Sequence, residues 1–143
     1  MSGSEPFDGM AKATTSLAPM LVVRRSAAAA EFYKQAFGAE ELWRTTSPDG
    51  EIVAHFRIEG AASPSEFWIH EESTQYGNYS PEALGGCACR MILNVPDPDA
   101  MFARAVAAGA KVISEPRDME YHWRQSRIED PFGHHWEIGK QLD

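Results

Sequence analysis

The sequence predicts an α+β fold in which one strand–helix–three-strand unit occurs twice. A short apolar strand segment is followed by an amphipathic helix near the start of the chain, and the same order recurs after residue 87. Each helix closes with a Gly-Ala pair, Gly38-Ala39 in the first unit and Gly109-Ala110 in the second. Three strand segments follow each helix, so an internal duplication of roughly 50 residues explains the pattern best.

The first unit is expected to span residues 17–71, after a flexible tail at 1–16 that is rich in Ser, Gly, Ala and Thr without an apolar period. The run Pro19–Val23 is of strand type. The helix over 27–37 shows apolar residues at i, i+3, i+4 and i+7, with Ser26 as its predicted N-cap and Gly38 as a left-handed C-terminal cap. Three further strands are predicted at 41–45, 51–58 and 66–70.

The second unit is expected to span 87–140, after a linker at 72–86 that contains Tyr76 and Tyr79. Its first strand is predicted at 89–95. Asp97 is the predicted N-cap of the next helix because Pro98 stands at the favoured first helical position, and this helix ends at Gly109. The remaining strands are predicted at 110–113, 124–128 and 135–139.

Composition and charge narrow the classes of partner. The 143 residues carry 13 Lys and Arg against 21 Asp and Glu, a net charge of -8 that disfavours nucleic acid and anionic membrane surfaces. The sequence has no run of 18 apolar residues and no secretory signal, so we expect no membrane partner and a cytoplasmic location. Cys87 and Cys89 are spaced for neither a redox nor a zinc motif, and we expect both to face the helix layer as buried thiols.

Two phrases, together with the order of elements, carry a family resemblance. They are Phe37-Gly38-Ala39 and Glu129-Asp130-Pro131-Phe132-Gly133-His134-His135-Trp136-Glu137-Ile138. The chain resembles the glyoxalase / bleomycin-resistance / extradiol dioxygenase family, or vicinal oxygen chelate superfamily, and within it the small bacterial glyoxalase-like branch. The resemblance implies one domain, 17–143, of two βαβββ modules whose curled mixed sheet forms a cup with the helices on its outer face. It also implies a homodimer.

The resemblance further implies four metal-ligand positions, on the first and fourth strand of each module. Glu137 matches one of them and is the candidate catalytic residue, and His70 is the second metal candidate. The other two positions hold Ala18, which has no donor atom, and Arg90, whose guanidinium repels a cation. We therefore expect a degenerate metal site and no cofactor, with a divalent metal as the alternative. His55 is either a third ligand or a histidine that lines the cup.

Strand alternation assigns side chains to the concave face of the cup. Two members of this set, Arg90 and Arg127, suit a ligand carboxylate or phosphonate, unless Arg90 simply neutralises Glu137. His134 is expected to face away from His135, and Trp136 to face the helices. The predicted lining is mostly apolar with a few convergent polar groups, as small-molecule sites are; it comprises Met20, Val22, His55, Arg57, Trp68, His70, Arg90, Ile92, Gln125, Arg127, His135 and Glu137.

Three functions follow from this lining. The preferred one is binding of a small organic molecule in the cup, with catalysis left open. The first alternative is a metal-dependent lyase, isomerase or dioxygenase in which Glu137 and His70 hold the ion. The second is a drug-sequestering resistance protein in which Trp68 and the neighbours of Trp136 stack on an aromatic drug. The linker tyrosines and Tyr121-His122-Trp123 could cover the cup or form a dimer contact, and Trp43 is expected in the core or an interface.

Overall fold

The chain folds into two four-stranded mixed sheets of identical topology. The computed structural model describes residues 15–60 and 65–143, so nearly all of the expected tail at 1–16 lies outside the described residues. In the first sheet the strands lie in the order β1-β4-β3-β2, and in the second they lie in the order β5-β8-β7-β6. In each sheet the first pair of this order is parallel and the other pairs are antiparallel. The predicted α+β fold with two βαβββ modules is confirmed.

The elements run in the same sequence in both modules. The first module contains β1 (Met20–Val23), α2 (Ser26–Phe37), β2 (Glu40–Thr46), β3 (Ile52–Ile58) and β4 (Ser65–Glu71). The second contains β5 (Arg90–Asn94), α4 (Pro98–Ala107), β6 (Lys111–Asp118), β7 (Trp123–Glu129) and β8 (His135–Gln141). The connection between them is not a plain loop, because it holds the 3-10 turn η1 (Thr74–Tyr76) and the short helix α3 (Pro81–Leu84).

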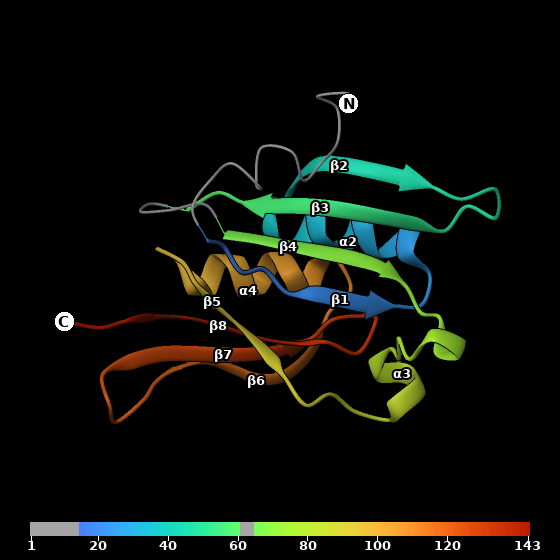
Figure 1. Cartoon of the computed structure of the whole chain (residues 1–143). Helices are drawn as coiled ribbons and strands as arrows, with labels where there is room; N and C mark the ends of the chain where they lie inside the picture. Colours follow the sequence, from blue (N-terminus) through green and yellow to red (C-terminus); the bar gives the residue numbers. More distant parts are fainter. Residues whose placement is uncertain (1–14, 61–64) are drawn as a thin grey trace.

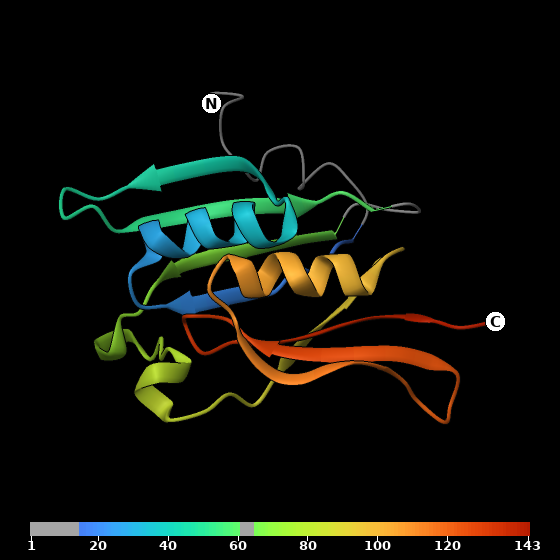
Figure 2. The same cartoon turned by 180° about the vertical axis from the view of Figure 1, so that it is seen from behind.

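Each sheet has one face covered by a helix and one open face (Figures 1 and 2). Helix α2 packs on β3 and β4, helix α4 packs on β6, β7 and β8, and the two helices pack against each other. Both sheets turn their open faces the same way, toward the viewer of Figure 1. The sheets are curled but not closed, with the helices outside, as predicted.

A single aromatic core joins the two modules. Phe37 of α2 lies 4.5 Å from Trp136 of β8, and Phe67 of β4 lies 5.7 Å from the same indole, as distances between ring centroids. Tyr33 packs against Phe67 at 5.3 Å. Trp136 is 3% exposed, which confirms that it faces the helices. Because the core rings come from both repeats, the modules share one hydrophobic interior.

The start of α2 differs from the prediction. Ser26 is the first helical residue and not the N-cap; its Oγ accepts a hydrogen bond from the backbone N–H of Ile52 in β3. Arg25 precedes it in the left-handed conformation, with φ 60°. The Glu71 carboxylate caps the helix instead, accepting from the N–H of Arg25 at 3.0 Å and of Ser26 at 2.9 Å. Local sequence rules miss this cap because Glu71 is 45 residues away.

The other helix ends follow the sequence closely. Asp97 caps α4 by accepting from the N–H of Ala100 at 3.1 Å, with Pro98 at the first helical position. Gly38 ends α2 with φ 64°, a left-handed conformation that glycine adopts without penalty.

Strand β6 continues to Asp118, five residues beyond the predicted end at 113, because it pairs with β7 along its length through two register shifts.

Asp130 ties the turn before β8 to helix α2. Its Oδ2 accepts from Tyr33 Oη at 2.5 Å and from Trp136 Nε1 at 2.9 Å. Its Oδ1 accepts from the backbone N–H groups of Phe132 at 2.9 Å and His134 at 3.0 Å. Burial raises the pKa of Tyr33 well above its usual value, and the Asp130 charge adds to this shift. This carboxylate therefore fixes where β8 begins, and with it the side chains of that strand.

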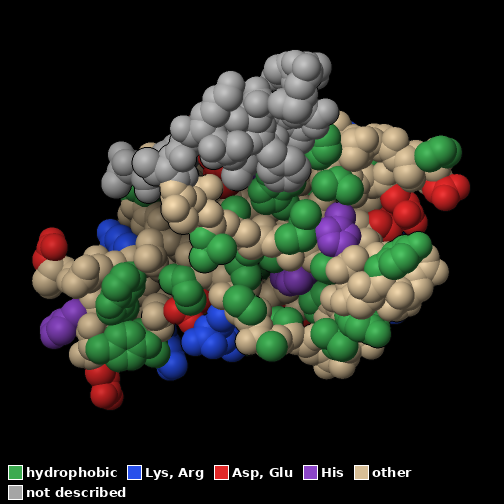
Figure 3. All heavy atoms as spheres, viewed as in Figure 1, with side chains coloured by type: hydrophobic (Ala, Val, Ile, Leu, Met, Phe, Trp, Pro, Cys, Tyr) green, Lys and Arg blue, Asp and Glu red, His purple; other side chains and the backbone are tan. Residues whose placement is uncertain are grey.

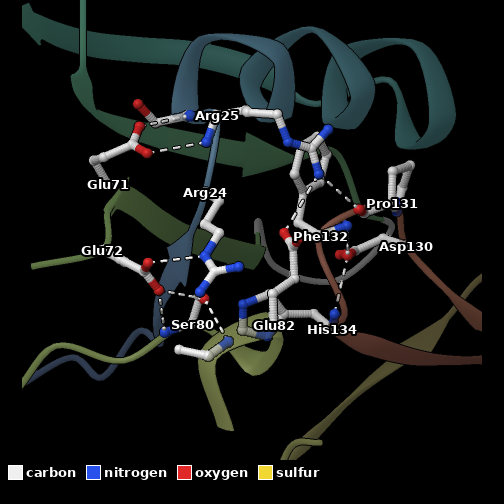
Figure 4. A network of polar contacts seen from close by, with 12 residues as sticks. Arg24, Arg25, Glu71, Glu72, Ser80, Glu82, Asp130, Pro131, Phe132 and His134 are labelled. Carbon is white, nitrogen blue, oxygen red and sulfur yellow. Dashed lines mark hydrogen bonds and ion pairs between the residues drawn. The ribbon is translucent and has the colours of Figure 1, made fainter. Parts of the chain in front are cut away.

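A second polar network holds the linker helix α3 in place (Figure 4). Glu72 accepts from Ser80 Oγ at 2.5 Å and from Arg24 Nε at 2.8 Å. Arg25 reaches from the start of α2 to Glu82 of α3 at 3.3 Å and to the carbonyl oxygen of Pro131 at 3.2 Å. Arg25 thus bonds both to the linker helix and to the turn before β8 in the second module. Among the described residues, no helix is both long and apolar enough to cross a membrane.

Candidate functional site

The open face of the first sheet carries an aromatic row. Cross-strand pairing places Met20 of β1 beside Trp68 of β4, Trp68 beside His55 of β3, and His55 beside Trp43 of β2. The imidazole of His55 stacks on the Trp68 indole with ring centroids 4.0 Å apart and planes inclined by 4°. Trp43 lies 6.1 Å from the Trp68 ring. In Figure 3, hydrophobic and histidine side chains gather over this sheet.

Ion pairs border the aromatic row on the same face. His55 Nε2 lies 2.7 Å from Glu66 Oε1, a contact that becomes a charged pair when the imidazole is protonated. Arg57 donates to Glu40 Oε2 at 3.2 Å across β2 and β3. His55 is only 7% exposed while Met20 is 45% exposed, so the row runs from a buried centre to an open edge at β1.

His70 stands next to this row and borders a cavity of about 370 Å³. Val53 and Thr45 line the same cavity from the neighbouring strands, and Tyr76 lines it from η1. His70 Nδ1 lies 2.7 Å from the carbonyl oxygen of Glu71, so in the neutral imidazole Nδ1 donates and Nε2 is left as the acceptor. Of the two linker tyrosines, Tyr76 is the one that reaches a cavity of the first sheet.

The open face of the second sheet is charged. Arg90 Nε donates to Glu137 Oε1 at 3.2 Å, and Gln125 Nε2 donates to Glu137 Oε2 at 3.1 Å, so both carboxylate oxygens are engaged. The sequence alternative in which Arg90 pairs with Glu137 is the arrangement observed. Arg127 lies opposite Glu137 in the register of β7 and β8. His135 faces the same side, while His134 turns away and binds the carbonyl oxygen of Val22 at 2.8 Å.

A second cavity, of about 320 Å³, lies beside these side chains. Its lining consists of Gly86, Cys87, Ala88, Cys89, Arg90, Arg127 and His135. None of these residues belongs to the first module, and none of the residues around the His70 cavity belongs to the second. Four residues predicted to line one cup therefore border two different cavities, His70 on the first sheet and Arg90, Arg127 and His135 on the second. Lys and Arg side chains gather over the second sheet in Figure 3.

The two metal candidates do not form a joint site. His70 borders the cavity of the first sheet, whereas Glu137 pairs with Arg90 beside the cavity of the second sheet. Within residues 15–60 and 65–143, no group of three His, Cys, Asp or Glu side chains is arranged to hold a metal ion. A guanidinium in contact with the remaining carboxylate opposes a divalent cation. These residues do not fit the four-ligand metal centre that the resemblance implies.

The structure places three residues differently from the sequence prediction. Trp43 joins the aromatic row because a β-bulge between Glu41 and Trp43 shifts the pairing, so that Glu41 lies opposite the buried Phe56 and Trp43 opposite His55. The prediction that Cys87 and Cys89 are buried against the helices is wrong: Cys89 is exposed and both line the second cavity. Strand β5 begins only at Arg90, so strand alternation does not apply to the cysteines.

Comparisons with known proteins agree with this architecture. Residues 15–138 match the family described as Glyoxalase/Bleomycin resistance protein/Dioxygenase superfamily. The uncharacterized protein Mb0911c of Mycobacterium bovis is 38% identical over 131 residues, which are 89% of this chain and 84% of that protein. The structure of TioX from Micromonospora sp. ML1 is similar with a TM-score of 0.68 and 26% identity, covering 90% of this chain and 100% of TioX.

A more distant structure shares the fold alone. The fosfomycin resistance protein FosX of Listeria monocytogenes, in a mutant form complexed with Mn(II) and 1S,2S-dihydroxypropylphosphonic acid, has a TM-score of 0.66 and 18% identity, covering 91% of this chain and 93% of that one. The matched family covers both modules and nearly all of the described residues. The chain therefore belongs to the glyoxalase/bleomycin resistance protein/dioxygenase superfamily.

Proposed function

We propose that this protein binds a small organic molecule on the open faces of its two sheets and that its metal site is degenerate. The observation that carries the proposal is the pairing of Glu137, whose two carboxylate oxygens are held by Arg90 and Gln125. A carboxylate engaged in this way supports a polar ligand-binding surface better than a metal centre. The ligand-contacting residues we propose are Met20, His55, Arg57, Trp68, His70, Arg90, Arg127, His135 and Glu137.

The two faces offer complementary contacts to such a ligand. On the first sheet, the partly exposed ring of Trp43 provides aromatic surface beside the stacked pair of His55 and Trp68, which are each 7% exposed. The second sheet provides guanidinium groups and a carboxylate. A few fixed charges beside aromatic surface give both affinity and orientation to a bound organic molecule.

We further propose that the protein is a homodimer. Several large apolar side chains are exposed on the edge strands of the sheets, among them Ile92 of β5 at 55% and Ile113 of β6 at 40%. Among residues 15–60 and 65–143, strands β1 and β5 each pair on one side only. A second copy would cover this apolar surface, and light scattering coupled to size exclusion is expected to give twice the chain mass.

Metal analysis tests the proposal directly. Protein purified without a histidine tag is expected to carry no stoichiometric Mn, Fe, Ni or Zn, and Glu137→Ala is expected to leave its metal content unchanged. One equivalent of a divalent metal that disappears in Glu137→Ala would overturn the proposal in favour of a metal-dependent lyase, isomerase or dioxygenase.

Tryptophan fluorescence tests ligand binding on the first sheet. Aromatic organic molecules titrated in the presence of EDTA are expected to quench the emission saturably, and Trp43→Phe is expected to reduce the amplitude because Trp43 is the more exposed ring of the row. Saturable quenching by antibiotics without turnover would assign the sequestering function. Trp43 is the ring of this row that is partly open to such a ligand, whereas Trp68 is 7% exposed and Trp136 is 3% exposed.

A further inference from the structure

The cavity of the second sheet combines cationic side chains with two free thiols. Arg90 and Arg127 contribute the cationic groups, His135 adds an imidazole, and the segment before β5 contributes Cys87 and Cys89. The cavity measures about 320 Å³, at the lower end of the range for small-molecule sites. Arginine and histidine in one cavity of a chain with net charge -8 form a local feature that runs against the overall charge.

One guanidinium in this cavity, that of Arg127, has no carboxylate partner among the described residues. Arg90 has a carboxylate partner in Glu137, and His135 lies 3.5 Å from Glu129. The Arg127 side chain has neither a hydrogen bond nor an ion pair with any described residue, although it is partly buried. It faces Glu137 across the strands, but that carboxylate is already occupied by Arg90 and Gln125. The Arg127 guanidinium is therefore left without an acceptor from the described residues, and Arg127 lines the cavity.

An anion satisfies this arrangement and other ligand types do not. A guanidinium presents a planar fork of donors that matches two oxygens of a carboxylate or phosphonate. A cation would meet Arg90 and Arg127 together, and an uncharged apolar group would leave the Arg127 donors unpaired. The thiols add soft, weakly polar surface at the rim, which suits the carbon portion of an organic acid.

We propose that this cavity binds the oxyanion group of an organic acid, with Arg127 as its main contact and Arg90 as the second. The inference rests on the proposed small-molecule function and names the chemical class of the ligand and the sheet that takes its charged end. The cysteines lie in the same cavity, so the rate at which they react reports on charge there.

Alkylation with two reagents of matched size measures that charge. Iodoacetate is anionic and iodoacetamide is neutral, and each transfers its carbon to the thiolate while iodide leaves. The ratio of their rate constants cancels the reactivity of the thiolate itself. In Cys87→Ser protein, where Cys89 is the remaining thiol, the iodoacetate-to-iodoacetamide ratio is expected to exceed that of N-acetylcysteine amide roughly threefold to tenfold and to fall as salt is added.

Variants assign the effect to Arg127. Arg127→Gln is expected to remove most of the excess ratio, while Arg127→Lys, which keeps the charge, retains much of it. Arg117→Gln is the matched control, because Arg117 is an exposed arginine of the same sheet outside the cavity lining, and it is expected to leave the ratio unchanged. A ratio equal to the free-thiol reference, or one that falls equally in both glutamine variants, overturns the proposal. The reciprocal Cys89→Ser protein repeats the measurement at Cys87.

Protection by organic acids identifies the head group. Benzoate or phenylphosphonate is expected to slow alkylation of Cys89 by iodoacetamide, and benzyl alcohol is not. Stronger protection by phenylphosphonate assigns a tetrahedral head group, and stronger protection by benzoate a planar one. Equal protection by benzyl alcohol overturns the anion site while leaving small-molecule binding intact, so the two proposals fail separately.

Discussion

Replacing Asp130 by Asn tests how the two modules are held together. The carboxylate accepts four hydrogen bonds, two on each oxygen, from donors in α2, in β8 and in the turn between β7 and β8. An amide keeps one oxygen and turns the other into a donor. Whichever way the amide is oriented, two of the four hydrogen-bond donors then face its NH2 group and lose their acceptor.

The loss of stability in Asp130→Asn follows from these two unpaired donors. Each buried polar group left without a partner costs about 1–3 kcal/mol, so two of them cost about 2–6 kcal/mol. Removing the buried negative charge offsets part of this, because burial raises the pKa of Asp130 and so disfavours the ionised form. We expect Asp130→Asn to lower the free energy of unfolding by about 2–4 kcal/mol, a large part of the stability of an ordinary domain.

Tyr33→Phe is the graded comparison. It deletes one of the four donors and leaves Asp130 three, so a loss of about 1–2 kcal/mol is expected. Urea unfolding followed by tryptophan fluorescence and by far-ultraviolet circular dichroism measures both variants, and the two probes are expected to coincide because one core joins the modules. A loss below about 1 kcal/mol in Asp130→Asn, or a larger loss in Tyr33→Phe, would refute this account of the network.

Three further predictions concern helix capping, the linker and pH. Glu71→Ala removes the carboxylate that caps α2 and is expected to cost about 1–2 kcal/mol in urea unfolding, with Glu71→Gln closer to wild type. Glu72→Gln is expected to speed amide hydrogen exchange over residues 73–86. Hydrogen bonds from Ser80 and then from Arg24 lower the pKa of Glu72 below the ordinary value of 4.5. In the wild type, the slow exchange of this segment is therefore expected to be lost as the pH falls below 4.5 and Glu72 becomes protonated. The raised pKa of Tyr33 means that the unfolded chain loses this proton first, so stability is expected to decline as the pH rises above about 10, and less steeply in Tyr33→Phe. Unchanged exchange in Glu72→Gln, or parallel alkaline profiles for Tyr33→Phe and wild type, would contradict the respective assignments.

Most of the fold was predictable from hydrophobic periodicity and from turn-forming residues. The apolar spacing of α2 and the alternation of β3 and β8 are set by local residues, so the sequence located these elements and the faces they bury. Asp97 and Gly38 cap their helices through neighbouring backbone groups, so both caps were also predictable from the sequence. Ser26 was misassigned because the actual cap comes from a distant carboxylate, and no local pattern records that contact.

Strand alternation predicted the faces of the candidate site but not its cavities. Alternation placed His55, Trp68, Arg127 and Glu137 on open faces, as the strand register shows. It could not show that the two faces carry separate cavities, because that depends on how the sheets are arranged around the shared core. The bulge that brings Trp43 beside His55 adds one residue to β2, and a one-residue shift reverses the face of a side chain.

Nuclear magnetic resonance of the arginine side chains tests most directly whether the second sheet holds a small-molecule site that works without a metal. Phenylphosphonate is titrated in the presence of EDTA into protein labelled with nitrogen-15, and the Nε–H signals are recorded. We predict saturable shifts for Arg127 and Arg90, with the exposed Arg117 unaffected. Shifts at Arg127 and Arg90 that are absent in EDTA and develop only after Mn(II) is added would contradict a small-molecule site that works without a metal.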